Sequence, residues 1–203
     1  GEGSANEKLQ TFIKTIPDDD AIDQLYAELS LYWDAILEEF PLLREDGSRM
    51  RSDSDQTSDE EIDGQLHTNH MLFRPIVQEG VFAKLVRARL DASDGELNEE
   101  DVRSALSGLG KAPWRGFELP WRNLVFVYDS EKDSWRMRSE DRKAVISLAY
   151  RILRWIVGID SFPSEDSLNE SLRKPWESLL LNVSEADRDT MWQEIEERAA
   201  DFR

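Results

Sequence analysis

The stretch HMLFRPIVQEGVFAKLVRARL, residues 70–90, decides how this chain folds. Three apolar residues lead to Arg74 and Pro75, and apolar positions then recur at the i, i+3 and i+4 spacing of a helix. Proline fits the first turn of a helix, so we expect a helix from Pro75 to about Leu90. Its inward side chains should be Val81, Phe82, Leu85, Val86 and Leu90.

On the N-terminal side, residues 4–16 read as a short amphipathic helix, and a longer one follows from Asp18 or Asp19, either of which can cap it. This second helix has the most regular period in the chain, and Pro41 marks its exit. Residues 44–64 are rich in Ser and Asp without an apolar period, which predicts a flexible acidic loop. The apolar positions of the second helix are Ile22, Leu25, Leu29, Tyr32, Trp33, Ile36, Leu37 and Phe40.

On the C-terminal side, three further helices carry start and stop signals. Asn98 should cap a helix from Glu99 to about Leu109, closed by Gly110. Ser139 should cap a long helix that ends at Val157 before Gly158. Short helices are expected around Pro175-Trp176, and a final one begins after Ser184, with Asp187 completing a capping-box-like pair.

An aromatic segment and a hairpin separate these helices. PWRGFELPW, residues 113–121, is a stacking platform for bases, a groove for a partner or a plug of the core, and the plug is the favoured interpretation. LVFVY (124–128) and SWRMR (134–138) flank a short polar turn, which predicts a β-hairpin.

We therefore expect a mainly α fold, an irregular helical domain with one small β-hairpin. The expected parts are N-terminal helices (1–43), the acidic flexible loop (44–64), a helical core with the hairpin at about 124–138 (65–158), and C-terminal helices (159–203), in one domain overall. Because the chain begins with Gly-Glu-Gly-Ser and not with Met, we expect it to be part of a longer protein.

Composition excludes several classes of function. The chain has no cysteine, so disulfides and thiolate chemistry are excluded, and it lacks Walker, G-x-S-x-G and H-E-x-x-H motifs. No apolar run is long enough to span a bilayer, and a cytoplasmic location without membrane contact is expected. The net charge of −18 disfavours DNA binding by this chain alone. An acidic soluble surface, or a salt-adapted source, also accounts for that charge.

Two central blocks of the chain are nevertheless basic. Residues 65–90 and 113–158 each carry a net charge of +3, whereas residues 1–64 carry −13. If the two blocks pack together, their cations form a patch for phosphate or for an acidic partner; the favoured alternative is pairing with acids of the same chain. The candidate contact residues are Arg74, Lys84, Arg87, Arg138, Arg142, Lys143, Arg151 and Arg154.

The two histidines, His67 and His70, are the remaining candidates for chemistry. With Asp63 they could hold a metal ion, but no third strong ligand is evident, so ordinary loop or capping roles are favoured. Paired acids occur throughout so acidic a chain, and they indicate a solvated face. We therefore expect no catalytic residue, no metal and no cofactor.

Three segments, in order, resemble a known family: LYWDAILEEFP, then HMLFRPIVQEGVFAKLVRARL, then a PW…PW block and hairpin leading to RKAVISLAYRILRWIVG. This succession is similar to the C-terminal half of DGQHR-domain proteins, the group that includes DndB of bacterial DNA phosphorothioate (sulfur) modification systems. The similarity covers roughly residues 25–158. Gln78 matches the family's Gln after the proline, whereas Val77 replaces a small residue, and the family's N-terminal half is missing.

The resemblance implies a helical domain of a DndB-like protein in a DNA-modification or defence system, with a regulatory or assembly role and no catalysis. Its partners would be other proteins of the same system or the missing N-terminal half, and DNA would be reached through the full-length protein. The alternative is an acidic helical module for protein–protein interaction, or a DNA mimic, unrelated to DNA modification.

Overall fold

The computed structural model confirms the mainly helical class with a small β-hairpin. None of its described helices is long and apolar enough to cross a membrane. The residues that the structure describes are 18–41, 43–44, 60–62, 65–67, 70–91, 98–129, 131, 134–181 and 183–202. The helix expected over 4–16 and most of the loop expected over 44–64 lie outside them.

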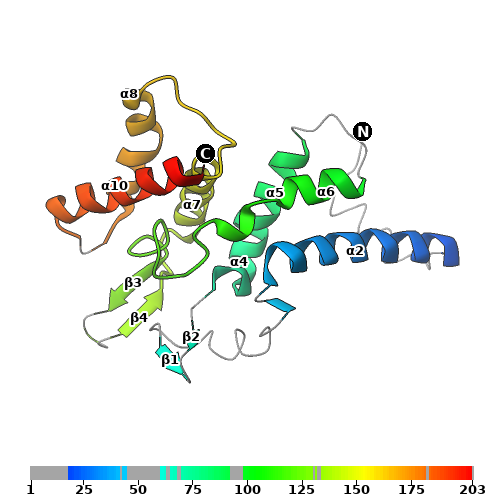
Figure 1. The fold of residues 1–203 in the computed structure, drawn as a ribbon. Coiled ribbons are helices and arrows are strands. Elements are labelled where there is room, and N and C mark those ends of the chain that lie inside the picture. Colours follow the sequence, from blue (N-terminus) through cyan, green and yellow to red (C-terminus); the bar gives the residue numbers. More distant parts are fainter. Residues whose placement is uncertain are drawn as a thin grey trace.

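The helices pack in an order that runs from one end of the molecule to the other (Figure 1). Helix α7 (Arg142–Ile156) lies at the centre. On one side it contacts α5 (Ala83–Leu90), α6 (Glu99–Leu106) packs on α5, and α2 (Asp19–Glu39) packs on α6. This order makes α2 the outermost helix on its side of the described structure.

The other side of α7 carries the C-terminal helices. A continuous helical segment is formed by α8 (Glu165–Leu168), a π-helical turn (Asn169–Arg173) and α9 (Lys174–Leu179). Helix α10 (Glu185–Phe202) also packs on α7, and three buried indoles, Trp155, Trp176 and Trp192, lie between these helices.

The stretch that opened the sequence, residues 70–90, forms the junction between the two sides. Helix α4 (Pro75–Val77) continues through a π-helical turn (Gln78–Phe82) into α5, as one helical segment. A Cβ placed on Gly80 would lie 2.7 Å from Ile146 Cγ2 of α7, so glycine permits the close approach of this segment to α7. The predicted inward side chains are buried or half-buried.

The expected hairpin is present: β3 (Phe126–Asp129) pairs antiparallel with β4 (Ser134–Met137). A second antiparallel pair joins β1 (Glu60–Ile62) to β2 (Gln65–His67), which the sequence had not indicated. Beside the hairpin, Trp114 and Trp121 are buried, and their indole N–H groups donate to the carbonyl oxygens of Leu109 (2.6 Å) and Pro113 (2.5 Å). The two tryptophans of the aromatic segment are therefore part of the core, and their rings are not exposed for stacking on bases.

Two predicted helix ends are wrong. Helix α6 ends at Leu106, because Gly108 takes the left-handed conformation (φ 78°) that breaks the helix before Gly110. Helix α7 begins at Arg142 after Asp141, and Ser139 does not cap it. The chain turns first at Asp141 (φ 51°), where Arg138 pairs with the Asp141 carboxylate.

Candidate protein-binding surface

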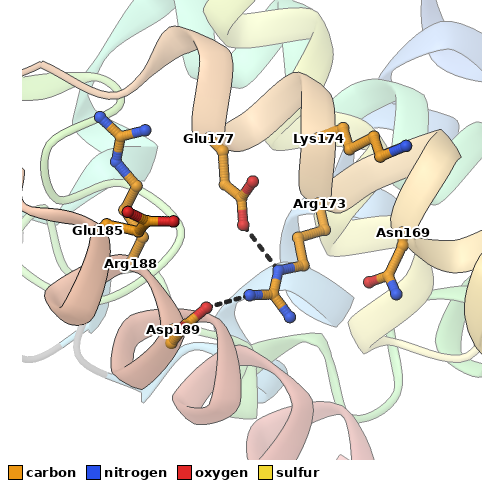
Figure 2. Close-up of a pocket in the computed structure, with 7 residues that line it drawn as sticks. All are labelled: Asn169, Arg173, Lys174, Glu177, Glu185, Arg188 and Asp189. Atoms are coloured by element: carbon orange, nitrogen blue, oxygen red, sulfur yellow. Dashed lines mark hydrogen bonds and ion pairs between the residues drawn. The ribbon is translucent and has the colours of Figure 1, made fainter.

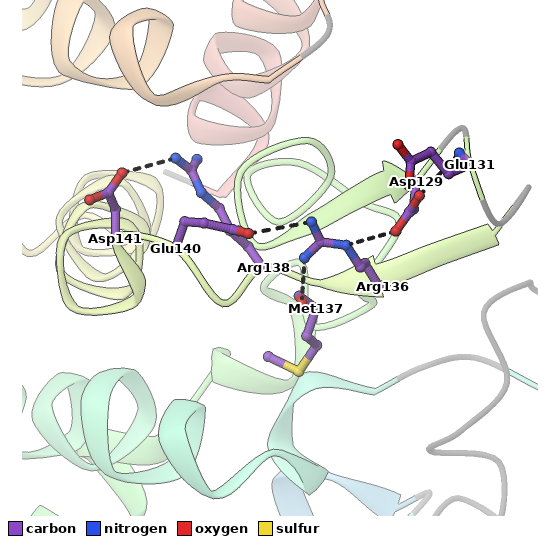
Figure 3. A network of polar contacts seen from close by, with 7 residues as sticks. All are labelled: Asp129, Glu131, Arg136, Met137, Arg138, Glu140 and Asp141. Carbon is purple, nitrogen blue, oxygen red and sulfur yellow. Dashed lines mark hydrogen bonds and ion pairs between the residues drawn. The ribbon is translucent and has the colours of Figure 1, made fainter.

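The sequence suggested Arg138 as a contact residue, but in the structure its side chain is buried and bonded to other residues of the chain. Its side chain is 5 % exposed, and its guanidinium donates to the carbonyl oxygen of Leu179 (2.5 Å) and to the Asp141 carboxylate (3.3 Å). Figure 3 shows it between β4 and the start of α7, beside Arg136, which pairs with Asp129 and Glu140. Arg138 therefore ties the hairpin to the end of α9, and its burial leaves little of the side chain accessible from outside.

The two basic blocks do pack together, at Tyr150. The Lys84 ammonium and the Arg154 guanidinium each lie 5.6 Å from the centre of its ring. Arg154 also forms a two-bond ion pair with Asp160 (2.7 and 2.9 Å), and this hydrogen bonding raises the pKa of Arg154. Arg151 donates to the carbonyl oxygen of Ser171 (2.5 Å). Arg151 and Arg154, in the second half of α7, are thus engaged within the chain.

The remaining candidate cations are scattered. Arg87 pairs with Asp91 at 2.8 Å, and Arg74 lies over the ring of Phe126 at 5.9 Å. Arg142 and Lys143 are exposed in the first turn of α7 and have no anionic partner among the described residues. Contact of these cations with phosphate or DNA stays a prediction.

His70 is buried and caps the short helical turn Met71–Phe73. Its Nδ1 accepts the Leu72 N–H (3.3 Å), and its ring packs edge-on against Phe40 and Phe73. Burial, and secondarily the nearby Arg115 charge, lower the pKa of His70 to about 4. No cluster of potential metal ligands occurs in the part of the chain that the structure describes, and the side chain of His67 lies outside it.

The neutrality of His70 makes stability depend on pH. Since the unfolded histidine has a pKa near 6.5 and the folded one a pKa near 4, the unfolded state binds the extra proton between these values. The contribution of His70 to the free energy of unfolding is therefore greatest above pH 6.5, and about 3 kcal/mol of it is lost as the pH falls to about 4. Replacing His70 with Gln should remove this loss, measured by urea unfolding at several pH values. Parallel pH curves for wild type and variant would contradict it.

A hollow of about 570 Å³ lies between α9 and α10 (Figure 2). Arg173 crosses it and pairs with Glu177 (2.7 Å) and Asp189. Since these charges satisfy one another and no nucleophile–base pair lies beside them, the hollow has the character of an internal ion-pair network.

The most unusual surface lies on α2. Five large apolar side chains on this helix are 40–73 % exposed, although large apolar groups of this kind are usually covered. Their spacing of three, four, seven and eleven residues from the first places all of them on one face. We call this face the α2 stripe, and it consists of Ile22, Leu25, Tyr26, Leu29 and Trp33.

The C-terminal end of the same face is anchored in the core. Phe40 lies seven residues after Trp33 and is 4 % exposed, with its ring against Phe82 and Trp114. On the same helix, Tyr32 and Ile36 line a mainly apolar groove of about 440 Å³ together with Phe82, Val86, Leu90 and Leu106. The α2 stripe is thus the outward continuation of the core along a helix that projects from the domain (Figure 1).

The local sequence explains why α2 holds this position. The Asp18 carboxylate caps the helix by accepting the Ala21 N–H (2.8 Å). At the other end, Glu39 accepts the Gly110 N–H (2.8 Å) and Glu38 pairs with Arg103 of α6. The C-terminal end of α2 is therefore docked on the rest of the domain, and the exposed α2 stripe lies on the part of the helix that precedes this end.

The sequence placed Ile22, Leu25, Leu29 and Trp33 among the apolar positions of a helix, but it did not single out Tyr26 or identify the surface. A regular apolar period gives the face of a helix without saying whether anything covers it. The available signal was the charge: residues 18–43 contain eight acids and no Lys or Arg.

Comparison of the chain with family models, curated proteins and solved structures finds no match.

Proposed function

We propose that this chain is a protein-binding module that holds a helical segment of another protein on the α2 stripe, without a catalytic centre of its own. The observation that carries the proposal is the exposure of Leu29 (59 %) and Trp33 (57 %) beside Tyr26 (73 %) on one face of an anchored helix. Tryptophan and tyrosine, such as Trp33 and Tyr26, are enriched among the few residues that contribute most of the binding free energy in protein interfaces.

The geometry of the α2 stripe suits a helix as the partner. From Ile22 to Trp33 it extends about 16 Å along the axis, a length that three turns of a second helix match. Apolar side chains at i, i+3, i+4 and i+7 pack into the corresponding face of another helix. The groove at Tyr32 and Ile36 would take one further apolar side chain of that segment.

Within the resemblance to DGQHR-domain proteins, this binding would serve assembly or regulation in a DNA-modification system. The bound segment would then belong to another protein of that system or to the missing N-terminal half. The coding sequence upstream of residue 1 discriminates these readings. An Asp-Gly-Gln-His-Arg motif there would favour the family reading, and a start codon just before Glu2 would remove it.

Selection from a displayed library of random amphipathic helical peptides tests the binding itself. With the full 203-residue chain as bait, we expect enriched peptides with apolar residues at i, i+3, i+4 and i+7. Replacing Leu29 and Trp33 together with Gln should weaken their binding by at least about 30-fold, because each truncated anchor costs about 1–2 kcal/mol or more. Stability should change by less than about 0.5 kcal/mol, because both side chains are exposed.

The matched control is Leu181→Gln, which removes an exposed leucine (36 %) outside α2. It should leave peptide binding unchanged. The proposal fails if no peptide is enriched over the Leu29→Gln/Trp33→Gln variant, or if the control weakens binding as much as that variant does.

A further inference from the structure

We infer that the segment bound by α2 is a basic amphipathic helix, with Lys or Arg along both edges of its apolar face. This inference rests on the proposed function, because it names the chemistry of the partner that the α2 stripe receives. It follows from the charges that border the stripe and from the absence of cations to balance them on that helix.

Acids border the α2 stripe on both sides. At 3.6 residues per turn, Asp23 and Asp34 lie about 100–120° round the helix from Ile22 on one side, and Glu28 lies about 120° round on the other. All three side chains belong to exposed residues. The stripe is thus an apolar ridge between two acidic edges, the complement of a helix with an apolar face and basic edges.

Cations of the described structure leave these edges unbalanced. Arg103 pairs with Glu38 near the docked end and is shared with Glu99, and the charge of Arg89 interacts with Glu39 at that same end. Gln24 donates to Glu28 (3.2 Å) but carries no charge. No ion pair joins Asp23 or Asp34 to any described Lys or Arg. A partner's cations would therefore meet acids that are still available.

The same charges argue against the two other occupants. A second copy would bring another α2 with eight acids and no base in residues 18–43, so its acidic edges would face acidic edges. The chain's own residues 1–17 contain Glu2, Glu7, Lys8 and Lys14, a formal charge of zero, and they match the acidic edges less well. A basic partner satisfies both the apolar and the charged part of the surface.

Three synthetic peptides of about 18 residues test the inference against the full chain. They share one Leu/Trp face of helical spacing and differ only at the edge positions, which are all Lys, all Gln or all Glu. Binding is measured by fluorescence anisotropy at about 50 mM and about 500 mM salt. We expect the Lys peptide to bind at least about tenfold more tightly than the Gln peptide at low salt, with the advantage falling below about threefold at high salt.

Two variants and one peptide separate edge recognition from general attraction to a chain of net charge −18. Asp23→Lys/Asp34→Lys should abolish the preference for the Lys peptide, whereas the equal charge change Glu197→Lys/Asp201→Lys on α10 should preserve most of it. A scrambled Lys peptide, with the same charge and no apolar face, should bind at least about tenfold more weakly than the ordered one.

Each other outcome overturns the inference in a recognisable way. Equal binding of Gln and Lys peptides, lost in Leu29→Gln/Trp33→Gln, would refute the basic partner and leave the proposed function standing. If no peptide bound through Leu29 and Trp33, both would fall. Self-association abolished by the same variant would identify a second copy as the occupant. Binding only after deletion of residues 1–17 would identify that segment.

Discussion

Replacing Trp192 with Ala should lower the free energy of unfolding by about 3–5 kcal/mol, the typical cost of removing a buried aromatic side chain. Trp192 is 1 % exposed, and its ring stacks on Trp155 with the ring centres 6.0 Å apart and the planes within 5°. It also contacts Trp176 at 5.4 Å, so one side chain joins α10 to α7 and α9. Urea unfolding, followed by circular dichroism, measures the loss.

The matched control for Trp192→Ala is Gln193→Ala on the same helix. Gln193 is exposed and donates only to Glu197 (2.9 Å), so its loss should cost less than about 0.5 kcal/mol. If Trp192→Ala cost no more than the control, α10 would not be packed on α7 as described.

Replacing Gly110 with Ala should destabilise the chain by about 3 kcal/mol, at the upper end of overpacking effects. A Cβ at this position would lie 2.2 Å from the carbonyl oxygen of Glu39 at the end of α2. Because that obstacle is backbone, it cannot rotate away, and the docked end of α2 would have to move. Urea unfolding gives the energy, and faster amide exchange over residues 34–39 would show that the loss arises at α2.

Two variants isolate the steric contribution. Lys111→Ala changes an exposed side chain of the same turn and should have little effect. Glu39→Ala removes the acceptor for the Gly110 N–H without adding a clash, so it should cost only about 1 kcal/mol. A Gly110→Ala variant as stable as Lys111→Ala would mean that α2 is not anchored through this contact.

Local signals in the sequence predicted most of the fold. Asp18, Asn98 and Ser184 cap the helices that were assigned to them, because a short polar side chain before an apolar period satisfies the first free N–H groups. The hairpin and the aromatic plug also follow from local composition. By contrast, Asp141 has a left-handed conformation beside the Arg138 guanidinium, and no local pattern in the sequence predicts it.

The candidate surface was less accessible to sequence reasoning. The spacing of the basic residues of α7 predicted a contact face. Their partners within the chain, such as Asp160 and the carbonyl oxygen of Ser171, depend on how later segments pack, which the spacing does not reveal. Exposure of Trp33 likewise depends on α2 being outermost in the packing order of the described helices. The acidity of α2 can be read from the sequence, but it indicates a binding surface only together with the exposed apolar face that the structure shows.

Hydrogen–deuterium exchange of the full chain, with and without the Lys-edged peptide, tests the central claim most directly. If α2 receives a basic amphipathic helix, amides between Ile22 and Trp33 should exchange more slowly in the complex, by about tenfold for each 1.4 kcal/mol of added stability. Amides of α7 and α10 should be unaffected. Protection that appears on α10 or elsewhere while α2 exchanges at its free rate would contradict the account.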